Sequence, residues 1–153
     1  MDASLISYLG DNRFPRAIRN NNPGNIRISA KNLIGKLPKE QRTDRSFEQF
    51  EYFWQGIASM ILIFDDYRHD GAKTIEKLIY RYAKPGALMQ PYCEVVSIGS
   101  GIRPRQIIPW NWQTIYLITN EIARYENNGR NPMIMSDVFA YAWIQHQNNY
   151  YGR

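Results

Sequence analysis

Apolar residues recur every three or four positions in four stretches of the chain, the spacing that places them on one face of an α-helix. The longest stretch extends from Phe47 to Tyr67. The tripeptide His69-Asp70-Gly71 follows it, and Gly71 suits the left-handed position after a helix end. Thr74 is expected to cap the second helix and Ser136 the last. The predicted buried faces are Ile57, Met60, Ile61, Phe64 and Tyr67; Ile75, Leu78, Ile79 and Tyr82; Ile115, Ile118, Ile122 and Tyr125; and Val138, Phe139, Ala142 and Trp143.

The chain between the second and last helices contains several breaks. Pro85-Gly86 is expected to end the second helix, and a short helix is predicted over residues 91–97. The following segment, GSGIRPRQIIPWN, is too rich in Gly and Pro for regular structure. A strongly amphipathic helix from Trp112 to Tyr125 comes next, and the segment ENNGRNP ends it.

The N-terminal third has a different pattern. Ile26 and Ile28 alternate with polar neighbours in the segment NIRIS, as they would in a half-buried strand. Residues 31–45 are polar and contain Gly35 and Pro38, which favours a loop or a loose hairpin. The predicted fold class is therefore mainly α (α+β), a helical domain with a small β-hairpin region near the N-terminus.

The segment RNNNPGNIR, from Arg19 to Arg27, has an unusual composition. Pro23 fixes its own φ and pushes Asn22 into the extended region, while Gly24 admits a positive φ. The segment is therefore predicted to be a shaped turn loaded with side-chain amides.

Composition indicates one globular domain over residues 1–153, with 44% hydrophobic residues and a real core. Cys93 is the only cysteine, so no internal disulfide is expected. The N-terminus lacks the features of a signal peptide, and no stretch is apolar enough for membrane insertion. His69 and His146 are far apart with no cysteine companion, so neither a metal nor a cofactor is expected.

The formal charge of +5 favours an anionic partner, which could be nucleic acid, an acidic membrane face or bacterial cell wall. The basic residues are scattered along the chain and do not form one dense run. No helix-turn-helix or nucleic-acid-binding sheet signature accompanies the 14% aromatic content, so nucleic acid is not the expected partner.

Several motifs together resemble a known family: RNNNPGNIR, FEQF, GIAS, the helix GAKTIEKLIYRYA, Tyr92 and YENNG. Phage virion-associated proteins that share the Asn-rich turn carry similar motifs, and they look like relatives of lysozyme-type peptidoglycan glycosidases and lytic transglycosylases. The resemblance extends from about Arg16 to about Ala142. It implies a lysozyme-like domain, peptidoglycan as the partner, possible contacts with other virion proteins, and a location in the virion or the host cytoplasm before release to the cell wall.

A glycosidase needs a general acid, usually a carboxylic acid in a partly apolar setting. Glu126 is the leading candidate because it ends an amphipathic helix beside Tyr125, where the helix dipole raises its pKa. The alternative is that Glu126 only terminates the helix. Asp44 matches an acidic position of the family and is either a second carboxylate or a helix N-terminal cap. Glu48 and Glu51 are the runners-up for the acid.

The candidate substrate-binding residues lie mostly in the Asn-rich turn. Amide and guanidinium groups on a rigid turn can bind a polysaccharide without an ordering cost, although asparagines also brace their own turns. Asn22 or Asn25 is expected to face a cleft. Trp54 and Trp110 are further candidates for stacking on sugar rings, and for Trp54 core packing is the favoured alternative. The candidates for substrate binding are Asn21, Asn22, Asn25, Arg27 and Tyr92.

Three functions from different classes remain open at this stage. The first is a peptidoglycan-degrading glycosidase that acts at entry or at lysis. The second is an inactive virion structural protein or cell-wall-binding protein, which is favoured because Lys84-Pro85-Gly86-Ala87 stands where the family has Glu-Asn. The third is a nucleic-acid-binding domain, which is favoured by the charge and the 14% aromatic content but by no recognisable helix-turn-helix or sheet signature.

Overall fold

The computed structural model describes residues 2–83 and 89–152, and this part of the chain is mainly helical. The expected end of the second helix at Pro85-Gly86 and the replaced Glu-Asn position lie outside the described residues. The elements are η1 (Ala3–Leu5), α1 (Arg16–Arg19), η2 (Lys39–Gln41), α2 (Phe53–His69), α3 (Ile75–Tyr82), α4 (Met89–Ser100), α5 (Trp112–Glu126) and α6 (Ser136–Tyr150).

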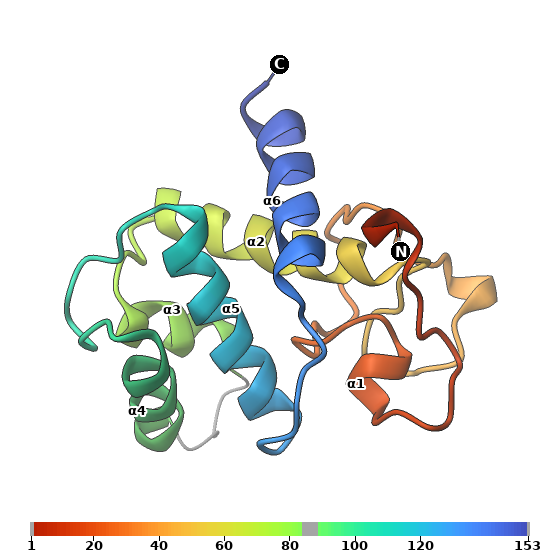
Figure 1. Ribbon diagram of the computed structural model, residues 1–153, viewed down its shortest axis with the longest axis horizontal. Coiled ribbons are helices and arrows are strands. Elements are labelled where there is room, and N and C mark those ends of the chain that lie inside the picture. The colour runs from red at the N-terminus through yellow and green to blue at the C-terminus, as the bar shows by residue number, and fades with distance from the viewer. Residues whose placement is uncertain (1, 84–88, 153) are drawn as a thin grey trace.

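Helix α2 runs through the centre of the molecule, with α3, α4 and α5 on one side and α1 with the N-terminal loops on the other (Figure 1). Helix α6 packs across α2, and α4 packs against both α3 and α5. Ile57, Met60, Ile61 and Phe64 of α2 are fully buried. The predicted core faces of the other helices are also buried, except that Tyr82, Tyr125 and Trp143 are only partly enclosed. The helical periodicity therefore located the core correctly.

The predicted start of the long helix at Phe47 is wrong, because α2 begins at Phe53. Residues 47–50 instead bond to distant backbone: the Glu48 N–H donates to the Ile26 carbonyl at 2.9 Å and the Phe50 N–H to the Asn20 carbonyl at 3.0 Å. Gln55 defines the true start, because its Oε1 accepts from the Tyr52 N–H at 2.9 Å.

The predicted β-hairpin is not formed in the described residues. Only isolated antiparallel bridges occur there, among them Arg27 with Phe47 and Lys36 with Phe50. The alternation of Ile26 and Ile28 marks extended backbone that bonds residues 46 and 48, and the Asn22 side chain also bonds the Ile26 and Glu48 backbone there. In the described part of this region the pairing does not extend beyond isolated bridges.

The helix ends follow the predicted signals in part. Thr74 Oγ1 accepts from the Lys77 N–H at 3.2 Å, and Gly71 has a φ of 95°. Ser136 is the first residue of α6 and not its cap, which is Met135. The cap of α5 was not predicted: Asn111 Oδ1 accepts from the Thr114 N–H at 2.9 Å.

A buried carboxylate near the C-terminal end of α2 fastens α6 to it. Asp65 has no exposed side chain, and it accepts hydrogen bonds from Tyr151 at 2.6 Å and from Arg68 at 2.9 Å, with His146 Nε2 at 2.8 Å. Burial alone would raise the pKa of Asp65, but these hydrogen bonds hold it below its usual range. Burial, together with the hydrogen bond to Asp65, raises the pKa of Tyr151 to about 12.

We expect Asp65→Asn to destabilise the fold by about 2–4 kcal/mol, because it leaves buried partners without an anionic acceptor. The midpoint of thermal unfolding should fall by roughly 5–15 °C at neutral pH. A depressed carboxyl pKa contributes stability above the unfolded pKa, and that stability is lost as the pH falls through the folded pKa. The gap between the two proteins should therefore close in strongly acidic solution.

Asp70→Asn is the matched control for this measurement. Asp70 pairs with Arg81 at 2.8 Å, but its side chain is 73% exposed. Exposed pairs contribute little, so the control should unfold within a few degrees of the native protein. Equal losses in both variants would contradict the anchoring role of Asp65.

Candidate active site

The Asn-rich turn is held by its own side chains. Asn21 Nδ2 donates to the Ser7 hydroxyl at 2.9 Å and to the Phe50 carbonyl at 2.9 Å, while Asn21 Oδ1 accepts from the Tyr8 N–H. Asn22 Nδ2 donates to the carbonyls of Ile26 and Glu48, and its Oδ1 accepts from the Ile26 N–H. Both asparagines are completely buried. They brace the turn and present no surface to a ligand.

Two asparagines of the turn adopt left-handed backbone conformations. Asn21 has a φ of 53° and Asn25 a φ of 51°, and asparagine tolerates this region better than most residues. The positive φ that was expected at Gly24 is not found there. Gly24 is needed for space, because a Cβ at that position would lie 2.3 Å from the Tyr82 hydroxyl.

The turn meets the end of α5 at Glu126. Asn25 Nδ2 donates to the Glu126 backbone carbonyl at 3.1 Å and lies 3.5 Å from the side-chain Oε1. Tyr92 of α4 donates its hydroxyl proton to the other carboxyl oxygen, Oε2, at 2.7 Å. The structure therefore brings together Glu126, Asn25 and Tyr92, which were predicted separately as site residues.

Three neighbouring contacts fix this arrangement. The ring of Tyr92 stacks on that of Tyr125, with ring centroids 3.8 Å apart. Asn127 Nδ2 donates to the Pro23 carbonyl at 3.0 Å, which ties the end of α5 to the turn. Tyr82 of α3 donates its hydroxyl to the Gly24 carbonyl. Helices α3, α4 and α5 and the turn thus converge on the Glu126 carboxyl.

The environment of Glu126 raises the pKa of its carboxyl group. Burial raises its pKa, although hydrogen bonds from Tyr92 and Asn25 and the nearby charge of Arg27 act in the opposite direction. Burial also raises the pKa of Tyr92 and Tyr82, and the charge of Glu126 adds to both shifts. Both tyrosines therefore stay neutral hydrogen-bond donors.

The pKa of Asp44 is shifted in the direction opposite to that of Glu126. Two guanidinium nitrogens of Arg16 donate to its carboxylate at 2.6 and 2.7 Å, and Asn20 Nδ2 donates at 2.9 Å. The backbone N–H groups of Ser46 and Phe47 also donate to it, as in a helix cap, although no helix follows. The Arg16 guanidinium, opposed by partial burial, holds the pKa of Asp44 well below its usual range. Asp44 is a fixed anion whose recorded partners do not include Glu126.

The remaining candidates lie apart from the Glu126 carboxyl. Glu48 is buried and paired with Lys36 at 3.1 Å, while Glu51 is exposed. Trp110 packs under Arg68, whose guanidinium carbon lies 4.3 Å from the indole centroid. Of the predicted binding residues, Asn25, Arg27 and Tyr92 are the ones near Glu126.

Tyr82 and Asn127 are site residues that the sequence did not identify. Tyr82 has the spacing of a core residue, and Asn127 lies in an Asn-Asn-Gly break where an amide has no obvious partner. Their roles depend on contacts with Gly24 and Pro23, more than 50 positions away along the chain.

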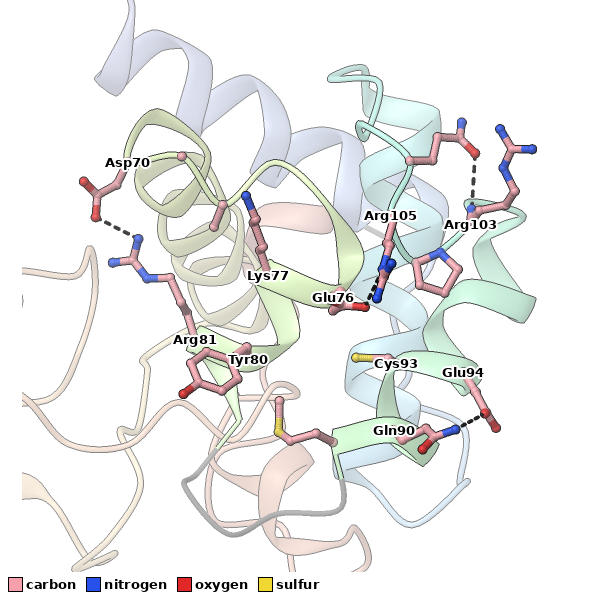
Figure 2. Close-up of a pocket in the computed structure, with 15 residues that line it drawn as sticks. Asp70, Glu76, Lys77, Tyr80, Arg81, Gln90, Cys93, Glu94, Arg103 and Arg105 are labelled. Carbon is pink, nitrogen blue, oxygen red and sulfur yellow. Dashed lines mark hydrogen bonds and ion pairs between the residues drawn. The ribbon is translucent and has the colours of Figure 1, made fainter.

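A large groove of about 1370 Å³ lies on the other side of α4 and does not include Glu126. Figure 2 shows that Arg81 points towards Asp70 and Arg105 towards Glu76 within it. These charges neutralise one another, and the Cys93 thiol at its wall has a pKa that burial raises.

Within residues 2–83 and 89–152, no group of three or more His, Cys, Asp or Glu side chains is placed to hold a metal ion. No described helix has the length and hydrophobicity that crossing a lipid bilayer requires. A scan of the chain against protein-family models gives no match. A search of curated protein sequences gives no match either.

We expect Tyr92→Phe to raise the pKa of Glu126 further, because the change removes a hydrogen bond that stabilises the carboxylate. Carbon-detected NMR titration of the Glu126 carboxyl would measure the shift. Tyr125→Phe is the matched control, since it removes a hydroxyl from the ring stacked on Tyr92 and should leave this pKa nearly unchanged. An unchanged pKa in Tyr92→Phe would refute the contact.

We also expect Glu126→Gln to raise the thermal unfolding temperature by a few degrees at pH 7. A carboxyl group whose folded pKa lies above its unfolded pKa stabilises the protein below the unfolded pKa and loses that contribution as the pH rises through the folded pKa. The advantage of the variant should therefore shrink as the solution is acidified. Calorimetry across this pH range tests the sign, and a variant less stable at every pH would contradict it.

Proposed function

We propose that the protein is a peptidoglycan glycosidase with a lysozyme-like domain and that Glu126 is its general acid. The observation that carries the proposal is the Glu126 carboxyl: partly buried, with a raised pKa, and contacted by the Tyr92 hydroxyl and the Asn25 amide. A glycosidase acid must hold a proton at working pH and release it to the leaving oxygen, which requires such a setting. The resemblance of the Asn-rich motif to that of the phage virion-associated proteins also supports the proposal.

The state of Asp44 favours chemistry with one carboxylate. A retaining hydrolase needs a second carboxylate near the sugar as its nucleophile, and an inverting one needs a base for water. Asp44 is saturated by Arg16, Asn20 and two backbone donors. In the lytic transglycosylase reaction Glu126 protonates the glycosidic oxygen, and the C6 hydroxyl of the sugar then attacks C1 and returns a proton to Glu126.

The neighbours of Glu126 have distinct parts in this scheme. Tyr92 stabilises the carboxylate that remains after proton donation, since its hydroxyl lies 2.7 Å from Oε2. Asn25 Oδ1 is enclosed and has no hydrogen-bond partner in the described structure, which leaves an acceptor for an amide N–H of the substrate. Arg27 is exposed and supplies a cation for the lactyl carboxylate or peptide of the wall polymer.

The test is digestion of purified peptidoglycan followed by mass spectrometry of the soluble fragments. The native protein should release muropeptides with anhydro ends, and Glu126→Gln should lower the rate at least 1000-fold. The rate should also fall as the pH rises through the pKa of Glu126, because the acid must be protonated.

Glu121→Gln is the control, because Glu121 lies on the same helix and pairs with the neighbouring Arg124 at 4.0 Å. It should retain activity. Fragments with reducing ends would favour a hydrolase over a transglycosylase. Binding to the wall without any fragments would refute catalysis and support the alternative of a cell-wall-binding virion protein.

A further inference from the structure

A second groove, of about 620 Å³, lies between residues 32–35, α2 and the C-terminal half of α6. We call it the α2–α6 groove. Its apolar wall includes Leu33, Trp54 and Leu62, and its polar wall includes the side-chain amides of Asn32, Gln145 and Asn148. The volume falls in the range of sites that bind small ligands.

The α2–α6 groove is separate from the Glu126 site. On α2 the groove residues Trp54, Ala58 and Leu62 are spaced by four and share one face. Gly56 and Met60 lie on the opposite face, where a Cβ on Gly56 would collide with the Asn21 carbonyl and Met60 contacts Gly24. The groove and the Asn-rich turn therefore lie on opposite sides of the same helix.

The chemistry of the groove fits a neutral ligand with both polar and apolar surfaces. No Lys, Arg, Asp or Glu is among the described residues that line it. The side-chain amides of Asn32, Gln145 and Asn148 make no hydrogen bonds within the described structure, so their donors and acceptors are available. Trp54 is 8% exposed, and it lines the groove together with aliphatic Leu33 and Leu62.

An unpartnered hydroxyl points to a ligand independently. Ser59 lines the groove and is 1% exposed, yet its Oγ has no hydrogen-bond partner. A buried hydroxyl without a partner is costly, and such groups in native proteins call for an explanation. A ligand hydroxyl or amide in the groove would satisfy it.

We propose that the α2–α6 groove binds an N-acetylated sugar of the glycan strand as a site separate from Glu126. The amides pair with ring hydroxyls, Ser59 Oγ with a hydroxyl or the acetamide, and the apolar wall with the acetamide methyl and a sugar face. The inference of a neutral ligand with polar and apolar surfaces rests on the groove residues alone, whereas the choice of an N-acetylated sugar rests on the proposed function.

The experiment is NMR titration of the Glu126→Gln protein with the N-acetylglucosamine disaccharide N,N′-diacetylchitobiose, so that no cleavage can occur. The indole N–H signal of Trp54 and the side-chain amide signals of Gln145 and Asn148 should shift in a saturable way. The double change Gln145→Ala with Asn148→Ala should weaken this binding at least tenfold. Gln113→Ala, an exposed amide on α5, is the matched control and should bind as the parent does.

Ser59→Ala separates binding from folding. It removes the unpartnered hydroxyl, so the unfolding temperature should not fall, while the dissociation constant should rise several-fold. Loss of affinity together with unfolding would contradict the role assigned to Ser59.

The outcomes distinguish this inference from the proposed function. Signals that shift only around Tyr92 and Asn25 would overturn sugar binding in the α2–α6 groove and leave the glycosidase proposal standing. The same holds if no signal shifts although the native protein cuts the wall. Saturable shifts at Trp54 in a protein that cuts no wall would support the groove while the glycosidase proposal fails.

Discussion

The fold depends on the buried side-chain amides of the Asn-rich turn, which supplement the few backbone hydrogen bonds between the extended N-terminal segments. In the described N-terminal region only isolated bridges join the extended segments, so their backbone groups need other partners. The completely buried Asn21 and Asn22 supply several of them, because their amides bond backbone groups of residues 8, 26, 48, 50 and 51. The buried Asn20 amide adds bonds to the side chains of Asp44 and Gln49. An isolated bridge is weak, whereas a buried amide with every partner in place is rigid.

This rigidity is what positions the candidate acid. Asn25 leaves the braced turn in a left-handed conformation and reaches Glu126 of α5, 101 positions away. Asn127, the residue after α5, also contacts the turn, because its Nδ2 donates to the Pro23 carbonyl. A carboxylate at the C-terminal end of a helix opposes the helix dipole, and burial adds to its cost. Glu126 therefore occupies a position that local structure disfavours, which agrees with the catalytic role proposed for it.

The sequence predicted the parts of the fold that repeat regularly. The buried stripes of α2, α3, α5 and α6 were correct because burial of one face imposes a period near 3.6. The start of α2 was missed because Phe47 and Phe50 continue an apolar pattern although their backbone bonds to the turn. The predicted hairpin is not formed in the described residues, because the alternation of two isoleucines predicts extended backbone but does not reveal what that backbone pairs with.

The site was predictable only one residue at a time. Composition alone singled out the Asn-rich turn, and the helix end marked Glu126, but neither indicates that Asn22 faces inwards while Asn25 faces the carboxyl. That distinction depends on which amide meets the Ile26 and Glu48 backbone. Asp44 could not be separated from a catalytic carboxylate until Arg16, 28 positions away, was seen to neutralise it. A local sequence pattern carries no information about hydrogen bonds and ion pairs between residues that lie far apart along the chain.

Helix α2 links the two proposed binding sites mechanically. Because Gly56 allows the Asn21 carbonyl to approach its backbone, the turn is fixed to one face of α2 while Trp54 and Ser59 belong to the groove on the other. A disaccharide cannot reach both sites at once, but a cell-wall network of many strands can. Under the proposed function, binding of one strand in the α2–α6 groove would raise the local concentration of others at Glu126, which favours a polymeric substrate over soluble fragments without any change in the acid itself.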